Sequence, residues 1–167
     1  MCGIAGAFHP DRLSEAAFEA VRRMQRALGH RGPDGEGWFQ GQRIALAHRR
    51  LSIIDLATGD QPIEDESGRL HIVVNGEFYD FERIRADLEA RGHVFRTRSD
   101  SEIALHLYED LGSACLHQLR GEFAFAIWDD VEKTLFAARD RVGLKPFHYA
   151  VVGDSFVFAS EIKAILA

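Results

Sequence analysis

The stretch EFAFAIWDD, residues 122–130, opens the part of the sequence that decides the fold class. Three further strand-like segments follow it, separated by turn residues: TLFAARD (134–140), FHYAVV (147–152) and SFVFASE (155–161). Several of these segments carry apolar residues on both faces, which predicts strands in a sheet that is covered on both sides. The last third of the chain is therefore predicted to be mainly β-structure.

Residues 1–55 are predicted to hold one helix among several short strands. Residues 3–8 are small and apolar, which indicates a buried strand near the start of the chain. A helix follows, which Gly29 can end, because apolar residues recur at helical spacing: Phe18, Val21, Met24 and Leu28. Strand-like runs then occupy residues 37–39 and 44–47, and RRLSIID (49–55) continues in strand-like composition.

The segment LHIVV, residues 70–74, predicts another strand. We expect it to end at Asn75-Gly76, a pair that suits a sharp turn. Asp80 is placed to cap the next helix, which Gly92 can close and which has one apolar face: Phe81, Ile84 and Leu88.

A third helix is predicted at IALHLYEDLG, residues 103–112. Ser99 and Glu102 stand before it with the spacing of a capping box. Helices grouped between runs of strands are typical of the α+β class, so we predict two sheets packed between helical layers.

Size and composition are those of one soluble globular domain. The chain has 167 residues, of which 46% are apolar and 28% charged, so it can bury a core. No apolar run approaches the roughly 20 residues of a transmembrane helix, and no membrane segment is expected. The start, MCGIAGAFHPDR, has neither a basic leader nor a long apolar stretch, so we expect no secretion signal.

Charge and residue types narrow the classes of function. The net charge of -6 and the lack of a basic stripe argue against a nucleic-acid partner. Cys2 and Cys115 form no CxxC pair, which favours the reducing cytoplasm over a disulfide. The eight histidines are scattered without an HExxH motif or paired spacing, so we expect no metal site.

Cys2 has two interpretations. A free cysteine is commonly a small buried hydrophobic residue. Its position directly behind Met1 suggests chemistry instead, because removal of Met1 would give one residue both a thiol and a free α-amine. Such an amine has an ordinary pKa of about 7.7–8.0 and can act as general base for its own thiol near neutral pH. We expect Met1 to be removed.

Other residues supply what an attack on an amino-acid amide requires. Asn75 and the Gly76 amide can donate hydrogen bonds to an oxyanion, although the pair could equally be a simple turn. The Arg50 guanidinium suits an α-carboxylate, unless it is merely a solvated surface arginine. Asp100 and Glu77 are candidates for an α-ammonium, although Asp100 could instead stabilise the first turn of its helix.

Six blocks of this sequence resemble class II glutamine amidotransferase domains in their order and spacing. The blocks are MCGIAG (1–6), HRGPDG (30–35), HRRLSIID (48–55), NGEFYD (75–80), SDSE (99–102) and RDRVGLKPFHY (139–149). The chain is most similar to the N-terminal domain of glutamine-hydrolysing asparagine synthetases, over residues 1–167. The resemblance implies a single glutaminase domain with the four-layer αββα sandwich of N-terminal-nucleophile hydrolases.

The resemblance also implies a role for each candidate residue. The implied catalytic groups are Cys2 as the nucleophile and Asn75 with the Gly76 amide as the oxyanion hole. The implied glutamine-binding residues are Arg50 for the carboxylate, Asp100 for the ammonium, and Glu77 beside it. Hydrolysis of L-glutamine to glutamate and ammonia would need no cofactor or metal.

A larger enzyme is implied as well. The ammonia would serve a C-terminal ATP-pyrophosphatase synthetase domain, most simply for asparagine synthesis, and ATP and magnesium would bind only there. That domain carries an SGGxDS-type phosphate loop, which this sequence lacks, so the chain is expected to be the N-terminal part of a larger synthetase. A homodimer is left open.

Some positions depart from the family pattern. NGEFYD stands where NGEIYN is more common, which makes Phe78 and Asp80 variant positions. KPFHY stands where KPLYY is common, with His148 in place of a tyrosine. These changes concern the subfamily rather than the proposed chemistry. The RDRVGLKPFHY block itself is interpreted as a structural turn or a face for a neighbouring domain.

Two alternatives of other classes remain from the sequence. One is a module that binds glutamine or docks on a synthetase but no longer turns over, with Met1 retained. The other is an N-terminal-nucleophile hydrolase of a different amide, against which the pairing of Arg50 with Asp100 argues.

Overall fold

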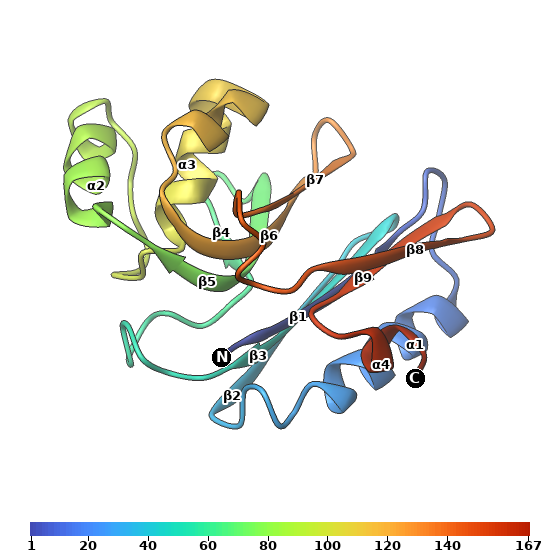
Figure 1. The fold of residues 1–167 in the computed structure, drawn as a ribbon. Helices are drawn as coiled ribbons and strands as arrows, with labels where there is room; N and C mark the ends of the chain where they lie inside the picture. Colours follow the sequence, from blue (N-terminus) through green and yellow to red (C-terminus); the bar gives the residue numbers. More distant parts are fainter.

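The computed structural model describes residues 1–167 as two antiparallel sheets enclosed by helices (Figure 1). The first sheet has five strands in the order β2-β3-β1-β9-β8. Its strands are β1 (Gly3–Phe8), β2 (Gly35–Gln40), β3 (Ile44–Arg50), β8 (His148–Val152) and β9 (Ser155–Ala159). The first and last parts of the chain thus meet in one sheet, since β1 pairs with β9 as well as β3.

The second sheet has four strands in the order β4-β5-β6-β7. They are β4 (Ile63–Glu64), β5 (Leu70–Phe78), β6 (Gly121–Asp129) and β7 (Thr134–Arg139). β5 and β6 pair along their full length, from Leu70 opposite Asp129 to Phe78 opposite Gly121, and both are almost wholly buried. These two strands are apolar on both faces because side chains cover them on both sides.

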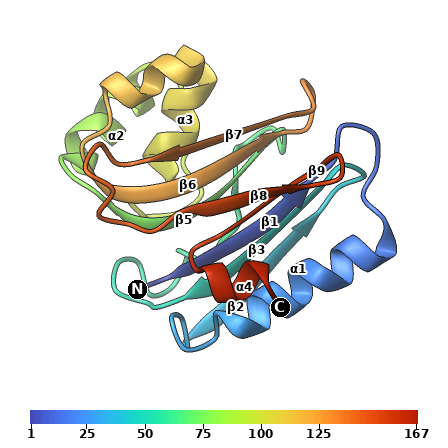
Figure 2. The same cartoon turned by 45° about the vertical axis from the view of Figure 1, so that its right-hand side comes forward.

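Helices cover the outer face of each sheet (Figure 2). α1 (Glu15–Ala27) and α4 (Ile162–Ile165) pack on the first sheet. α2 (Phe81–Ala90), α3 (Glu102–Leu111) and a short 3₁₀ helix, η1 (Gly112–His117), pack on the second. Ser14 caps α1 by accepting a hydrogen bond from the Ala17 amide.

Three apolar clusters hold the layers together. One lies between α1, α4 and the first sheet, and another between the second sheet and α2 with α3. The third joins the inner faces of the two sheets: Ile4, Ile44, Leu46, Val73, Ala124, Ala126, Trp128 and Phe158. These clusters confirm the α+β class and the αββα layering.

The Asn75-Gly76 pair does not form the predicted turn. Both residues lie inside β5, opposite Ala124 and Phe123. A Cβ atom at Gly76 would lie 2.2 Å from the Glu122 carbonyl oxygen, so this glycine permits the close approach of β6. Neighbouring strand pairing overrode the local turn preference.

Three other local expectations were wrong. RRLSIID does not continue as a strand, because β3 ends at Arg50. Asp80 precedes α2 but has a left-handed backbone (φ 57°) and makes no capping hydrogen bond with its side chain. Glu102 is the first residue of α3 and binds the amides of Arg96 and Thr97, so it does not complete a capping box with Ser99.

The predicted strand at residues 147–152 is an edge rather than a covered strand. In β8 the side chains of Tyr149, Val151 and Val152 are exposed. Cys2 and Cys115 are free thiols, as the sequence favoured. None of the helices is both long enough and apolar enough to cross a membrane.

Candidate active site

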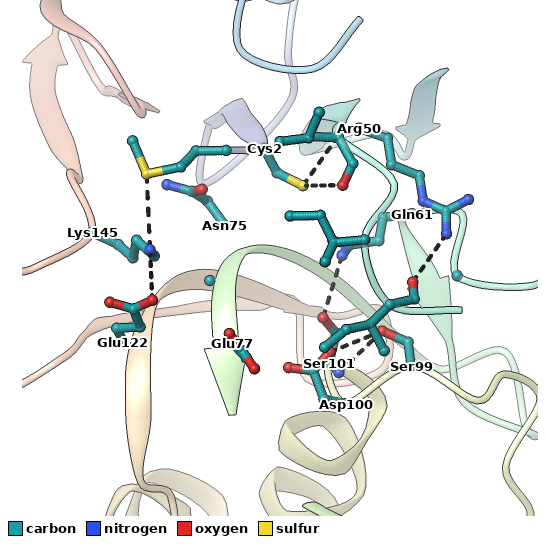
Figure 3. Close-up of a pocket in the computed structure, with 16 residues that line it drawn as sticks. Cys2, Arg50, Gln61, Asn75, Glu77, Ser99, Asp100, Ser101, Glu122 and Lys145 are labelled. Atoms are coloured by element: carbon teal, nitrogen blue, oxygen red, sulfur yellow. Dashed lines mark hydrogen bonds and ion pairs between the residues drawn. The ribbon is translucent and has the colours of Figure 1, made fainter. Parts of the chain in front are cut away.

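One pocket brings together all six residues predicted from the sequence (Figure 3). It is lined by Cys2, directly before β1, by Arg50 at the end of β3, and by four residues of the second sheet: Asn75, Gly76, Glu77 and Glu122. The segment that enters α3 adds Ser99, Asp100 and Ser101, and further lining comes from Met1, Leu51, Ile53, Ile54, Gly59, Gln61 and Lys145. The pocket therefore forms where the N-terminal end of β1 meets β5 and the start of α3.

Cys2 is half-buried, and its thiol contacts the backbone of Leu51. It stands directly before β1, where Gly3 pairs with Arg49 of β3. The Leu51 amide lies 3.5 Å from the Cys2 Sγ, which in turn lies 3.7 Å from the Leu51 carbonyl oxygen. The chain just beyond β3 therefore positions the thiol.

Arg31 is a positioning residue that the sequence analysis missed. Its Nε donates a 2.9 Å hydrogen bond to the Cys2 carbonyl oxygen, and its Nη1 lies 3.1 Å from Glu161 Oε1. Burial raises the pKa of Glu161, but Arg31, His30 and Lys163 outweigh it and lower the pKa to about 2. The sequence signal for Arg31 was its place in the HRGPDG block. Only the folded structure shows that this arginine contacts the Cys2 backbone.

Asn75 presents an unsatisfied amide to the pocket. The residue is 1% exposed, and neither its Nδ2 nor its Oδ1 has a hydrogen-bond partner. Leaving a buried polar atom unpaired costs about 1–3 kcal/mol, which is unusual unless a ligand completes the bonding. Asn75 lines the same pocket as Cys2 (Figure 3). Asn75 can thus donate to an oxygen held near the thiol.

Arg50 lines the pocket with its guanidinium already engaged. Its Nη1 lies 2.7 Å from Asp60 Oδ1, and its Nη2 donates to the carbonyl oxygens of Ile54 and Asp55. The side chain is 8% exposed, while that of Asp60 is 84% exposed. A ligand carboxylate would therefore share this guanidinium with Asp60 or displace it.

Asp100 and Glu77 place two carboxylates on one side of the pocket. Asp100 is buried, and its Oδ2 accepts a 2.7 Å hydrogen bond from the Phe78 amide. Burial raises the pKa of Asp100, and the negative charge of Glu77 raises it further, against the lowering effect of the Phe78 hydrogen bond. A cation between the two carboxylates would relieve their repulsion.

Gln61 and His48 support the strand that carries Asn75. β4 pairs with β5 only at residues 71 and 72, so the Val74 backbone beyond it lacks a strand partner on that side. Its amide donates to Gln61 Oε1 at 2.6 Å, and its carbonyl oxygen lies 3.2 Å from His48 Nε2. Burial lowers the pKa of His48 to about 4, so the ring is neutral and donates its Nε2–H to Val74.

Lys145 is a pocket residue that the sequence analysis missed. The RDRVGLKPFHY block forms a turn, as predicted, in which the Asp140 carboxylate accepts hydrogen bonds from three following backbone amides. This turn delivers Lys145 into the pocket, where its Nζ lies 3.1 Å from Glu122 Oε1 and 3.8 Å from Met1 Sδ. The block therefore contributes a cation beside the N-terminal residues.

Comparison with known proteins shows which family the chain resembles. A family profile described as "Glutamine amidotransferase domain" matches residues 1–167. Asparagine synthetase [glutamine-hydrolyzing] 1 of Bacillus subtilis is 39% identical over 99% of this chain, which corresponds to 27% of that protein. A protein named amidase chry2 from Gibberella zeae is 44% identical over the whole chain and 26% of its own length. The chain thus spans about a quarter of these relatives.

A solved structure has a similar fold. The glutamine phosphoribosylpyrophosphate amidotransferase of B. subtilis superimposes with a TM-score of 0.77 at 23% identity, over 98% of this chain and 42% of that one. This likeness concerns the fold alone. Because the family match extends over residues 1–167 and the relatives are about 40% identical to the chain over the aligned residues, the chain belongs to the family of glutamine amidotransferase domains.

Proposed function

We propose that this chain hydrolyses L-glutamine to glutamate and ammonia through a γ-glutamyl thioester on Cys2. The observation that carries the proposal is the buried Asn75 amide, which has no partner and lies in one pocket with the thiol. A preformed donor of this kind favours a reaction in which negative charge develops on a carbonyl oxygen.

The same pocket offers complementary charges for an amino-acid head group. Asp100 and Glu77 can hold an α-ammonium, and the Arg50 guanidinium can hold an α-carboxylate in exchange for part of its contact with Asp60. The amide end of the substrate would then face Cys2. This division of charges supports a free amino acid as the substrate.

The Cys2 α-amine is proposed as the general base, once Met1 has been removed. It takes the thiol proton, and the thiolate adds to the amide carbon while Asn75 Nδ2–H and the Gly76 amide stabilise the oxyanion. The ammonium returns its proton to the departing nitrogen, so ammonia leaves and the thioester remains. Water then adds to the thioester with the amine as base, and glutamate leaves as the thiol is restored.

Removal of Met1 would also change the shape of the pocket. Met1 lines it, and its sulfur lies beside Lys145. Cleavage of the Met1–Cys2 bond would open this space and expose the amine to the Lys145 and Glu122 charges. Neither a cofactor nor a metal takes part in the proposed reaction.

The proposed physiological role extends beyond this chain. The ammonia would pass to an ATP-pyrophosphatase synthetase domain, where ATP and magnesium would activate the acceptor, most simply aspartate for asparagine synthesis. Relatives named glutamine-hydrolysing asparagine synthetases, of which this chain matches about a quarter, support that assignment. The proposed location is the reducing cytoplasm, which suits the free Cys2 thiol. The proposal also includes assembly of the protein as a homodimer.

A second candidate is hydrolysis of a different amide. Two relatives named amidases, 43% and 44% identical over the whole chain, favour its consideration. They share the overall domain, so substrate choice would depend on the head-group contacts. Activity on simple amides that lack an α-ammonium and α-carboxylate would favour this candidate over glutamine.

The decisive experiment measures glutamate release from L-glutamine by protein whose intact mass confirms loss of Met1. We expect turnover, its loss in Cys2→Ala, and a raised KM in Asp100→Asn. Protein that retains Met1 serves as the matched control and should be inactive. Glutamine binding without turnover by the processed protein would contradict the proposal and support a silent binding module.

A further inference from the structure

Four ligand-type side chains converge on the outer side of the molecule, away from the active pocket. They are Glu66 in the β4–β5 loop, His93 after α2, and His106 with Glu109 on α3. One ligand atom from each lies within 4.8 Å of the others, and none of the four lines the active pocket. We call them the His–Glu cluster.

The spacing of the cluster is close to that of a tetrahedral metal site. The His106 Nδ1 lies 3.6 Å from both Glu66 Oε2 and Glu109 Oε2, and the His93 Nδ1 lies 3.3 Å from Glu109 Oε2. Donor atoms around zinc, at bond lengths of about 2.0–2.2 Å, stand roughly 3.4 Å apart. Three edges of the tetrahedron thus already have nearly the required length.

His106 is the buried member that the fold leaves unsatisfied. Its side chain is fully buried, and neither ring nitrogen has a hydrogen-bond partner. Burial lowers the pKa of His106, but Glu102, Glu66 and Glu109 raise it above the ordinary value. Either a proton on His106 or a bound metal ion can balance the negative charge of the surrounding carboxylates. The two possibilities lead to different experimental predictions.

The contacts behind the cluster favour a metal. Both histidines turn Nδ1 inward, while the opposite nitrogens face carboxylates: His106 Nε2 lies 3.6 Å from Glu102 Oε1, and His93 Nε2 lies 3.0 Å from Asp110 Oδ1. Metal-bound histidines typically donate their second N–H to a carboxylate, as His93 can to Asp110, while the His106 contact with Glu102 is longer than a hydrogen bond. Glu66 is similarly oriented, because its Oε1 accepts a hydrogen bond from the Val94 amide.

We propose that Glu66, His93, His106 and Glu109 bind one zinc ion in a structural site. Two imidazole and two carboxylate ligands suit zinc better than calcium or magnesium, which prefer oxygen ligands alone. Four protein ligands close the coordination shell, so the ion binds no substrate. The absence of a zinc motif in the sequence does not argue against this site, because its ligands come from three separate segments.

The site would tie the β4–β5 loop and the segment after α2 to α3. Glu102 extends this connection, because it faces His106 and also binds the amides of Arg96 and Thr97, which lead toward Asp100. Zinc would therefore stabilise the segment that carries one wall of the active pocket. The proposal does not rest on glutamine hydrolysis, and the test below measures metal binding alone.

The test titrates zinc into the chelator-treated 167-residue chain by calorimetry and counts bound zinc by elemental analysis after gel filtration. We expect one zinc per chain and a raised melting temperature. Cobalt in place of zinc should give the visible absorption of a tetrahedral complex. His93→Gln and Glu109→Gln should each weaken binding by at least tenfold, and Asp110→Asn by about tenfold.

Matched substitutions elsewhere serve as controls. His117→Gln on η1 and Glu82→Gln on α2 change the same residue types at exposed positions and should leave binding unchanged. Primary variants avoid His106, because its loss would disturb the core. Zinc binding that survives His93→Gln and Glu109→Gln but disappears in Cys2→Ala would overturn the proposal, as would no stoichiometric binding. His106 would then be a protonated imidazole among carboxylates.

Discussion

The two walls of the active pocket satisfy their polar groups in opposite ways. The β1–β3 wall, formed by Cys2, Arg50 and the supporting Arg31, is tied by internal contacts to backbone oxygens and carboxylates. The β5–α3 wall, formed by Asn75 and Asp100 with neighbouring Glu77, keeps an unpartnered amide and a carboxyl group whose pKa is raised by burial and by Glu77.

This difference separates positioning from binding. The β1–β3 wall fixes the nucleophile before any substrate arrives, which reduces the ordering needed in the reaction. The β5–α3 wall holds the Asn75 amide, which gains a partner only when a ligand or an oxyanion is present. Substitutions on the second wall should therefore affect activity more than stability, and the following predictions test that separation.

The largest effect is expected for Asn75→Ala. Loss of one oxyanion donor typically lowers kcat by about 10²–10³-fold, which is about 2.7–4 kcal/mol. The free energy of unfolding should not fall in proportion, because the Asn75 amide has no protein partner to lose. Steady-state glutamine hydrolysis and urea unfolding of the same preparations measure the two quantities. Equal losses of activity and stability would show that Asn75 serves the fold.

A smaller effect, on folding stability, is expected from protonation of His48, which links β3 to β5. The folded pKa of about 4 lies below the ordinary 6.5, so the unfolded chain binds more protons between these values. Folding stability is therefore fully present above pH 6.5 and falls by about 3 kcal/mol as the pH drops to 4. Urea unfolding at pH 7, 5.5 and 4 measures this loss.

His48→Gln provides the matched variant for that prediction. Glutamine retains an N–H donor for the Val74 carbonyl but has no titrating ring, so the acid loss should shrink by a similar amount. An unchanged pH dependence in this variant would assign the acid sensitivity to other groups. The walls would then be held together independently of the His48 charge state.

The smallest effect is expected for Arg31→Lys on the β1–β3 wall. Lysine keeps the charge but loses the fork that joins the Cys2 carbonyl to Glu161, and kcat should fall about fivefold, or about 1 kcal/mol. KM should change little, because Arg31 does not line the pocket. Arg49→Lys is the control, since Arg49 pairs with Glu36 outside the site. Equal effects of both substitutions would remove the positioning role from Arg31.

The sequence by itself determined the elements with strong periodicity and the residues with distinctive chemistry. Strand Gly3–Phe8, helix α1 and β6 followed from apolar patterns, whereas β5 was predicted only as far as Val74 and extends to Phe78. Cys2, Asn75 and Asp100 followed from residue type, position in the chain and family resemblance. All six predicted site residues line one pocket.

The tertiary structure decided what depends on partners distant in sequence. Asn75-Gly76 became strand because β6 pairs across it, and Glu102 left its predicted cap to bind residues 96 and 97. Arg31 and Lys145 lie in blocks that the family resemblance marked, but only the fold shows that they reach the Cys2 backbone and the pocket. The His–Glu cluster is assembled from three separate segments, so no spacing along the chain could reveal it. Local sequence sets helix, strand and turn preferences of about 1 kcal/mol per residue. The free energy gained from burial and strand pairing exceeds these preferences when the sheets and helices pack together.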